Sequence, residues 1–501
     1  MALATLATAP AALEWLHSRG VQSLATDSRL VQAGDAFIAW PGHAQDARAH
    51  VGDALKAGAA ACLVEAGGAD AFEFDASRVA SMTGLKAATG EIASAFFGNP
   101  SKRLKVLAVT GTNGKTSCVW WTAQALTALG QRCGVIGTLG VGQPPVRGHD
   151  SHIEFNGLTT PDPITLQRAF KRFADEGYSA CALEASSHGI AEHRLNGTQI
   201  QVALFTNLTQ DHLDYHGSMQ AYGDTKAKLF AWPGLQAAVL NVDDAFGVRL
   251  ALDLQASGLS VLTYSMRGTA TLRAANVSYP DGGLSFEVVE AGERAAVRTA
   301  LIGDYNVSNV LAVIGGLRAL GVSLNHAASV CAELTPVPGR MQRVAAKAGS
   351  PELVVDYAHT PDALEKSLLA LQALASARGG KLWCVFGCGG NRDATKRPLM
   401  GALAQRLAQH VVITTDNPRF EAPAFINLQI VAGLNGNQLG VKVIENRRSA
   451  IQTAVREAAA SDVILVAGKG HEEYQDVKGV KHPFSDVIEA SAALKLREVT
   501  A

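Results

Sequence analysis

The sequence has no uninterrupted run of about 18 apolar residues, the length that a membrane-spanning helix requires. Its Ala-rich start lacks the basic segment of a secretory signal, and Glu14 and His17 interrupt its apolar character. The sequence also has no large net charge: it contains 44 Lys and Arg residues and 45 Asp and Glu residues, which gives a formal net charge of −1. We therefore expect neither a membrane span nor a broad basic surface for nucleic acid.

Cysteine is sparse and shows no pairing pattern. Seven cysteines are scattered through 501 residues. Only Cys384 and Cys388 lie close together, and no second pair completes a zinc pattern. A scattered, odd-numbered set fits reduced thiols, so we expect a cytoplasmic protein. The chain is too long for one core, and about three domains are expected from its length.

The most informative stretch is a turn between an apolar run and a helical pattern. Residues 104–109 predict a buried strand, residues 117–129 predict a helix, and Thr110-Gly-Thr-Asn-Gly-Lys-Thr116 lies between them. Backbone N–H groups at the glycines, the helix N-terminus and the charge of Lys115 would cradle phosphates, and the Thr116 hydroxyl can bind Mg²⁺. Val109 stands where the strict P-loop pattern has glycine, so the match is to the shorter Gly-x-x-Gly-Lys-Thr form.

Changes in composition divide the chain into three regions. Residues 1–103 have the pattern of a small α/β lobe, and residues 104–337 alternate short apolar strands with helical patterns. A Gly- and Pro-rich break at residues 335–339 precedes the third region, 338–501. Strands alternating with helices favour parallel sheets. We expect an α/β protein with a small N-terminal lobe, a central P-loop-type mainly parallel sheet with helices, and a C-terminal Rossmann-like domain.

In the third region, four apolar runs each end in a polar cluster. The runs cover residues 353–355, 382–386, 411–414 and 463–467. Ligands of open α/β sheets bind outside the carboxyl ends of the strands. Four clusters at such ends therefore predict a binding site. Arg392, Arg419 and Glu472 lie in these clusters, so the ligand should carry charges of both signs.

Two further strand ends supply candidate metal ligands. Glu184 follows the apolar run at 179–183, and His212 lies a few residues after the run at 202–206. In a parallel sheet both ends should open on the same side as the phosphate turn. A nucleoside triphosphate brings Mg²⁺, which takes a few protein ligands. Glu184 and His212 are therefore candidate metal ligands.

Three activities are compatible with these features. A P-loop ATPase would need a group that positions water, together with a mechanical partner. A nucleotide-dependent ligase would need one substrate with a carboxylate and another with an amine. A non-catalytic nucleotide switch would need only the first two regions. The charged clusters of the third region favour the ligase.

The motifs together resemble the Mur ligase family along the whole chain. Besides the phosphate turn, the resemblance rests on residues 184–189, 207–216, 303–309, 339–343 and 356–361. It implies an ATP- and Mg²⁺-dependent ligase of peptidoglycan precursor synthesis. Asp416-Asn-Pro-Arg419 with Gly468-Lys-Gly-His-Glu472 resembles the members that join meso-diaminopimelate to UDP-N-acetylmuramoyl-L-alanyl-D-glutamate. We expect a monomer. A ligase for L-lysine and a nucleotide-binding regulatory protein without turnover are the alternatives.

The resemblance also implies roles for individual residues. The catalytic set is Lys115, Lys226, His212 and Glu184, and the metal set is Thr116, Glu184, His212 and Lys226 as a carbamate. ATP would be held by Gly111, Thr112, Asn113, Gly114, Lys115, Thr116, Ser117, Asn306, Arg340 and Asp356. The UDP-substrate would be held by Ser28, Leu30, His43, Ala44, Gln45, Thr159, Thr160, Ser186, Glu192 and Arg194. Meso-diaminopimelate would be held by Arg392, Asp416, Asn417, Pro418, Arg419, Gly468 and Glu472.

Two of these residues carry specific expectations. Glu192 stands where relatives often have Gln, and a carboxylate cannot donate the hydrogen bond of an amide. Lys226 matches a lysine that the family carries as a carbamate. Because CO₂ adds only to a neutral amine, Lys226 needs a lowered pKa, or trapping of the modified form by Mg²⁺. From residue type alone, Lys226 is predicted to be a surface lysine on a helix, like Lys228.

Overall fold

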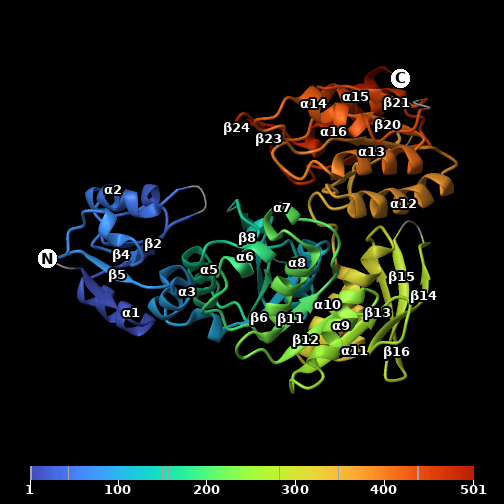
Figure 1. Ribbon diagram of the computed structural model, residues 1–501. Helices are drawn as coiled ribbons and strands as arrows, with labels where there is room; N and C mark the ends of the chain where they lie inside the picture. The colour runs from blue at the N-terminus through green and yellow to red at the C-terminus, as the bar shows by residue number, and fades with distance from the viewer. Residues whose placement is uncertain are drawn as a thin grey trace.

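The computed structural model describes residues 3–42, 45–148, 151–155, 157–280, 283–347, 349–436 and 439–500, with side chains to residue 497. His43 and Ala44 of the expected UDP-substrate set lie outside the described residues. The described residues form sheets of five, eleven and six strands and a separate two-stranded hairpin. These sheets correspond to an N-terminal lobe, a central body and a C-terminal lobe (Figure 1).

The N-terminal lobe is built on a parallel sheet of order β1-β5-β4-β3-β2. Helices α1 and α3 pack on one face of this sheet and α2 packs on the other, which explains the continuous apolar character of its inner strands. The elements are β1 (Ala4–Leu6), α1 (Ala9–Ser18), β2 (Ser23–Ala25), β3 (Asp35–Ala39), α2 (Val51–Lys56), β4 (Ala61–Glu65), β5 (Val79–Met82) and α3 (Leu85–Phe96).

The central body is an eleven-stranded sheet of order β16-β15-β14-β13-β12-β11-β6-β10-β7-β8-β9. Its middle is parallel, as expected. The antiparallel pairs at both ends, β7-β8-β9 and β14-β15-β16, were not expected. The strands are β6 (Lys105–Thr110), β7 (Cys133–Gly137), β8 (Gly140–Gln143), β9 (His152–Glu154), β10 (Ala180–Glu184), β11 (Val202–Phe205), β12 (Ala237–Asn241), β13 (Ser260–Ser265), β14 (Leu272–Ser278), β15 (Leu284–Glu290) and β16 (Glu293–Thr299).

Helices cover both faces of the central sheet. Along β6, Leu107 and Val109 pack into the core under α4 and α10, whereas Val106 and Ala108 face the core under α5. This burial on both faces explains why β6 is apolar throughout. The helices are α4 (Lys115–Ala128), α5 (Pro163–Asp175), α6 (Ser187–Ala191), α7 (Leu213–His216), α8 (Met219–Ala227), α9 (Ala245–Leu254), α10 (Tyr305–Ala319) and α11 (Leu324–Ser329).

The C-terminal lobe is a six-stranded sheet of order β17-β18-β22-β19-β20-β21, parallel except for β17. A buried ion pair between Arg447 and Asp486, at 2.6 Å between Nη2 and Oδ2, joins α15 to α16. The elements are β17 (Gln342–Val344), β18 (Glu352–Asp356), α12 (Pro361–Ala377), β19 (Leu382–Phe386), α13 (Lys396–Leu407), β20 (His410–Ile413), α14 (Pro423–Val431), β21 (Val441–Val443), α15 (Arg447–Glu457), β22 (Val463–Ala467), β23 (Tyr474–Val477), β24 (Val480–Pro483) and α16 (Asp486–Thr500).

The register of both large sheets brings the polar strand ends together. In the central sheet, Val109 pairs with Glu184 and Thr110 pairs with Phe205, so β6, β10 and β11 end at the same edge. In the C-terminal sheet, Ala467 pairs with both Asp356 and Phe386, so β18, β22 and β19 also end together. The sequence-based prediction of clustered strand ends is confirmed.

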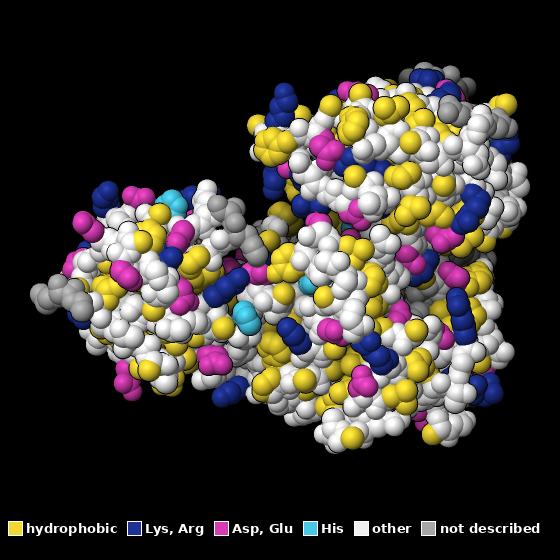
Figure 2. Space-filling view, in the orientation of Figure 1, with side chains coloured by type: hydrophobic (Ala, Val, Ile, Leu, Met, Phe, Trp, Pro, Cys, Tyr) yellow, Lys and Arg dark blue, Asp and Glu magenta, His cyan; other side chains and the backbone are white. Residues whose placement is uncertain are grey.

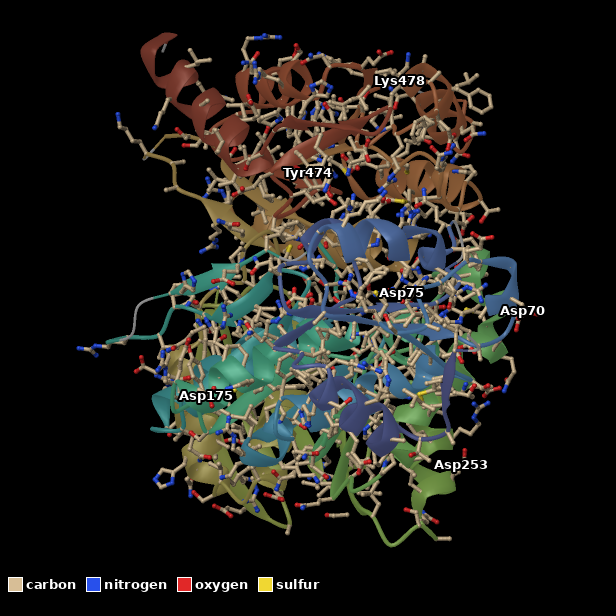
Figure 3. The ribbon with its side chains drawn as sticks, turned by 90° about the vertical axis from the view of Figure 1, so that its left-hand side faces the viewer. Asp70, Asp75, Asp175, Asp253, Tyr474 and Lys478 are labelled. Atoms are coloured by element: carbon tan, nitrogen blue, oxygen red, sulfur yellow. The ribbon has the colours of Figure 1, made fainter. Side chains whose placement is uncertain are left out.

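The N-terminal and C-terminal lobes both adjoin the central body and are separated from each other (Figures 1 and 2). The space-filling view shows a notch between the N-terminal and C-terminal lobes above the central body (Figure 2). Seen from the N-terminal side, Asp70 and Asp75 lie on the nearer lobe, and Tyr474 and Lys478 lie on the lobe above (Figure 3). Within the described chain, no helix is both long and apolar enough to span a bilayer.

Candidate active site

A cavity of about 1000 Å³ lies between the central body and the C-terminal lobe. It brings together the phosphate turn, the strand ends of the central sheet and the polar clusters of the C-terminal sheet. The expected site residues that line it are Thr112, Asn113, Gly114, Lys115, Thr116, Ser117, Thr159, Thr160, Glu184, Ser186, Arg194, His212, Asn306, Arg340, Asp356, Arg392, Asp416, Asn417, Arg419, Gly468 and Glu472.

The phosphate turn can be made only with glycine at two positions. Gly111 has φ 146°, and a Cβ there would lie 1.9 Å from the Thr206 hydroxyl oxygen. Gly114 has φ 85°, and its Cβ would lie 2.4 Å from Oδ1 of Asn309. The helix after the turn begins at Lys115, two residues earlier than the apolar pattern indicated. The first-turn N–H groups of α4 therefore open toward the cavity, as a phosphate site requires.

Lys115 folds back over this turn. Its Nζ donates to the carbonyl oxygens of Gly111 at 2.9 Å and Thr112 at 2.8 Å. Burial lowers the pKa of Lys115, and the carboxylate of Glu184 opposes this shift. Its ammonium is thus close to the positions where the turn would hold phosphate oxygens.

Lys226 is buried, with 1% of its surface exposed, so its interpretation from residue type as a surface lysine is wrong. The reason is that α8 packs against the phosphate turn, where Lys226 Nζ donates to the Gly111 carbonyl oxygen at 2.9 Å. The ring centroid of Tyr222 lies 4.3 Å from the same nitrogen. Burial and the neighbouring Lys115 charge lower the pKa of Lys226 well below its usual value. A neutral amine is the form to which CO₂ adds.

The two candidate metal ligands lie at the same edge of the central sheet. Glu184 Oε1 accepts from the backbone N–H of Thr138 at 2.8 Å, and Oε2 accepts from its hydroxyl at 3.2 Å. These bonds fix the carboxylate at the cavity wall. Burial lowers the pKa of His212 to about 4, so its imidazole is neutral at pH 7 and able to act as a ligand.

These residues fit a Mg²⁺ site of the kind that substrates complete. Within the described part of the chain, no group of three His, Cys, Asp or Glu side chains forms a ready-made metal cage. Mg²⁺ beside a nucleotide is usually held by one or two carboxylates, substrate phosphates and water. The Glu184 carboxylate and the Thr116 hydroxyl, both on the cavity wall, are suitable oxygen donors.

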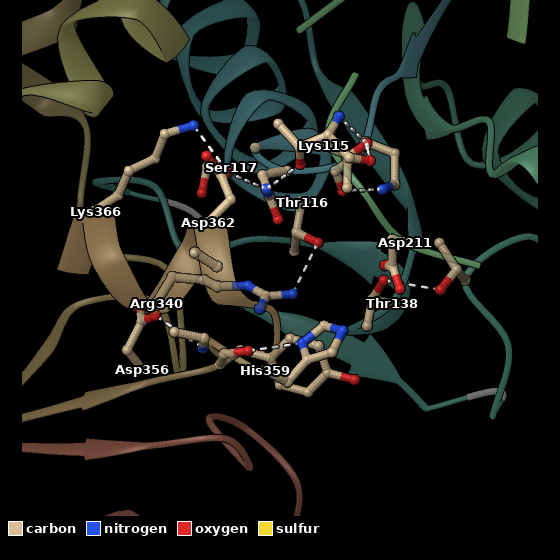
Figure 4. A pocket seen from close by; sticks show the side chains of 18 of the residues that line it. Lys115, Thr116, Ser117, Thr138, Asp211, Arg340, Asp356, His359, Asp362 and Lys366 are labelled. Carbon is tan, nitrogen blue, oxygen red and sulfur yellow. Dashed lines mark hydrogen bonds and ion pairs between the residues drawn. The ribbon is translucent and has the colours of Figure 1, made fainter. Parts of the chain in front are cut away.

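The residues expected at the nucleotide come from two lobes (Figure 4). The Arg340 guanidinium lies 4.1 Å from the ring centroid of Tyr357, and its Nη2 donates to the Thr116 hydroxyl oxygen at 3.3 Å. Asp356 accepts from the backbone N–H of Met341 at 2.7 Å. Burial raises the pKa of Asp356, and the charge of Arg340 opposes this shift. Asn306, on α10, completes this side of the cavity.

Several cavity residues were missed in the sequence. Asn113 Nδ2 donates to Asp362 Oδ2 at 2.8 Å, and Lys366 Nζ donates to the same oxygen at 2.9 Å, so the phosphate turn is bonded to the C-terminal lobe. Asp211 and His359 also line the cavity. Burial lowers the pKa of His359 to about 4. His359 lies three residues after the end of β18, and Asp362 lies in the first turn of α12, the helix that follows. Their place after a strand end was the signal that could have identified them.

Arg419 is held firmly by its backbone. It has φ 50°, its N–H donates to Asp476 O at 3.0 Å, and its carbonyl oxygen accepts from the N–H of Lys478 at 2.7 Å. Its Nη1 donates to the Gly390 carbonyl oxygen at 2.7 Å. Among the described residues, its other guanidinium nitrogens have no hydrogen-bond partner, so they can serve a ligand in the cavity.

The residues expected at the UDP-substrate divide into two groups. Thr160, Ser186 and Arg194 line the cavity, where Arg194 Nη1 donates to the Thr160 carbonyl oxygen at 2.9 Å. Ser28, Leu30 and Gln45 lie on the N-terminal lobe and do not line it, and Leu30 is 71% exposed. Their roles stay predictions.

Glu192 also lies outside the cavity lining. Its carboxylate accepts hydrogen bonds from Lys86, on α3 of the N-terminal lobe, and from the hydroxyl of Tyr215. The carboxylate at this position thus joins two lobes, a contact that the sequence did not indicate.

A turn with the geometry of a phosphate site and a separate charged cluster, both opening into one cavity, fit an ATP-dependent ligase. Comparison with known families agrees. Residues 109–317 match the Mur ligase middle domain, and residues 339–470 match the Mur ligase glutamate ligase domain. The chain belongs to the Mur ligase family.

Similar proteins extend over the whole chain. UDP-N-acetylmuramoyl-L-alanyl-D-glutamate--2,6-diaminopimelate ligase of Acidovorax sp. (strain JS42) is 55% identical over 99% of both chains. The protein of the same name from Pseudomonas aeruginosa is 46% identical over 96% of both. A solved structure with that name is 36% identical, covers 95% of both chains and has a TM-score of 0.66. MurF ligase from Thermotoga maritima in complex with ADP, 16% identical with a TM-score of 0.66, shares the fold.

Proposed function

We propose that this chain joins meso-diaminopimelate to the D-glutamate γ-carboxylate of UDP-N-acetylmuramoyl-L-alanyl-D-glutamate, with ATP cleaved to ADP and phosphate. The full-length similarity to ligases of that name supports this assignment. The observation that carries it is the single cavity lined both by Lys115 of the phosphate turn and by Arg419 and Glu472 of the charged cluster. Such a cavity can hold a nucleotide and an amino acid at the same time.

The first chemical step is transfer of the γ-phosphoryl group. A γ-carboxylate oxygen of the substrate attacks phosphorus, and the bond from phosphorus to the leaving oxygen of ADP breaks. Lys115 and the N–H groups at the start of α4 stabilise negative charge on the phosphoryl oxygens. Thr116, Glu184, His212 and Lys226, the last as a carbamate, would hold Mg²⁺, which would supply further positive charge to the phosphoryl oxygens.

The second step forms the amide. The neutral amine of the amino acid attacks the acyl phosphate, the carbon–nitrogen bond forms, phosphate leaves and the amine loses a proton. Water in the cavity would hydrolyse the acyl phosphate, so the C-terminal lobe has to cover the site during turnover. The contact between Asn113 and Asp362 joins the same two lobes. We further propose domain limits at 1–103, 104–337 and 338–501, and a monomer acting in the cytoplasm.

Amino-acid choice tests this function. Meso-diaminopimelate differs from L-lysine by a second carboxylate on the far carbon, and Arg419 is the residue type suited to a charge-assisted contact with it. We expect the purified protein to release phosphate from ATP only with both the UDP-dipeptide and an amino acid. It should prefer meso-diaminopimelate to L-lysine in kcat/KM. If no pairing of substrates led to release of phosphate, a nucleotide-binding protein without turnover would be favoured instead.

Replacement of Arg419 by alanine should reduce this preference. A hydrogen bond to a charged group is worth about 1.5–3 kcal/mol, or roughly 10- to 150-fold in kcat/KM. The loss should fall on meso-diaminopimelate and far less on the residual use of L-lysine. The exposed Arg456, on α15 and outside the cavity lining, offers a matched control as Arg456→Ala. Equal losses of kcat/KM for both amino acids would show that Arg419 does not determine amino-acid specificity.

A further inference from the structure

Lys469 is a buried lysine beneath the cluster proposed to bind the amino acid. Its side chain is 0% exposed. It does not line the cavity, whereas its neighbours Asn417 and Glu472 do. Because burial of an unpaired ammonium is strongly unfavourable, a lysine kept at this place needs partners. Those partners are the two cavity-lining side chains.

The contacts of Lys469 fix the orientation of both neighbours. Its Nζ donates to Asn417 Oδ1 at 2.9 Å and to Glu472 Oε2 at 3.0 Å. Asn417 Oδ1 also accepts from the backbone N–H of Asp476 at 2.9 Å, so Asn417 Nδ2 is left to donate to Glu472 Oε2 at 2.7 Å. Glu472 Oε2 therefore has two donors. Oε1 has no hydrogen-bond partner among the described residues and can face the cavity.

Two glycines make this placement of Lys469 possible. Gly468 has φ 115°, and a Cβ there would lie 2.5 Å from Asp416 Oδ2. Gly470 has φ 54°, and its Cβ would lie 2.7 Å from the Gly339 carbonyl oxygen. Lys469, between them, is buried and does not line the cavity, whereas Gly468 and His471 on either side of it do. Any side chain at either position would push the loop out of this arrangement.

The charges around Glu472 show why its partner matters. Burial raises the pKa of Glu472, the ammonium of Lys469 opposes this shift, and the carboxylate of Asp416 adds to it. Other titratable groups near this carboxylate include Tyr357, Tyr474, Arg447 and the adjacent His471. Without Lys469, Glu472 would hold its proton to higher pH, and a protonated carboxyl group cannot pair with an ammonium ion.

We propose that Lys469 is a positioning residue of the amino-acid site. From beneath the cavity floor, its ammonium group holds Asn417 and keeps Glu472 charged and oriented, with Oε1 toward the ammonium group of the incoming amino acid. This inference rests on the proposed function, because it takes an ammonium-bearing amino acid as the ligand. It assigns Lys469 an effect on amino-acid binding without contact with the amino acid.

The test is steady-state kinetics of Lys469→Met between pH 6 and pH 9. KM for meso-diaminopimelate should rise roughly 10- to 100-fold at pH 6, the loss expected for one charge-assisted contact. The ratio of variant to wild-type KM should shrink as the pH rises, because Glu472 then loses its proton. The KM values for ATP and for the UDP-dipeptide, and kcat, should change by less than about threefold. If Lys469 had a merely structural role, the variant would instead bind all three substrates more weakly or have a lower kcat at every pH.

A second comparison keeps the inference testable if Lys469→Met does not fold. The double variant Lys469→Met/Glu472→Gln replaces the buried pair by neutral groups, a change that folded proteins often tolerate. Its KM for the amino acid should lie within about threefold of that of Glu472→Gln alone. A further large rise would overturn the inference, as would a wild-type KM in Lys469→Met. If the wild-type protein showed no amino-acid-dependent turnover, the proposed function would be wrong, and this inference would fail with it.

Discussion

Replacing Lys115 with alanine should lower the ligation rate by roughly 100- to 1000-fold, the range for loss of one preorganised hydrogen-bond donor. The reason is geometric, because Lys115 Nζ lies over the phosphate turn, bonded to the carbonyl oxygens of Gly111 and Thr112. A transferring phosphoryl group depends on fixed positive charge more than on any covalent step of the protein. Phosphate release at saturating substrates measures this loss.

Two controls separate chemistry from folding in this variant. Far-UV circular dichroism and the thermal unfolding midpoint of Lys115→Ala should match wild type. Lys102 is an exposed lysine shortly before β6, and Lys102→Ala should retain full turnover. Near-wild-type turnover of a folded Lys115→Ala protein would show that the turn is not the phosphate site.

Replacing Lys226 with alanine should lower activity by roughly 100-fold or more. The lysine is buried against the phosphate turn, and its lowered pKa supplies the neutral amine that carbamate formation requires. If the working group is the carbamate, a small carboxylic acid such as acetate can occupy the vacated space and provide the same oxygen atoms. We therefore expect added acetate to restore part of the lost turnover.

The rescue has to be specific to this position. Lys228→Ala, two residues along the chain, should need no rescue, and acetate should not restore Lys115→Ala. A crystal structure with bound nucleotide should show Lys226 modified and next to Mg²⁺. An unmodified lysine far from the metal in that structure would count against the carbamate.

Much of the fold could be predicted because segments that are buried on both faces are apolar in the sequence. The strand β6 is apolar at Val106 through Val109 because helices cover both of its faces. The antiparallel ends of the central sheet were missed. Strands such as β16 (Glu293–Thr299) alternate between buried and exposed residues, and their partners are fixed by pairing rather than by their own pattern.

The candidate site was predictable where it follows from strand ends and a glycine turn. Glu184 and Asp356 end their strands at edges that the sheet register brings to one cavity. The burial of Lys226 was not predictable, because it depends on where α8 packs. Nor was the bond between Asn113 and Asp362, because residues 249 positions apart leave no local pattern.

The central claim is that the substrate carboxylate is phosphorylated by ATP before the amine attacks. Labelling the γ-carboxylate oxygens of the D-glutamate residue with ¹⁸O tests this most directly. After turnover with ATP and meso-diaminopimelate, mass spectrometry of the released phosphate should find one labelled oxygen in each phosphate. Released phosphate without label, from a reaction that forms the amide product, would contradict the account.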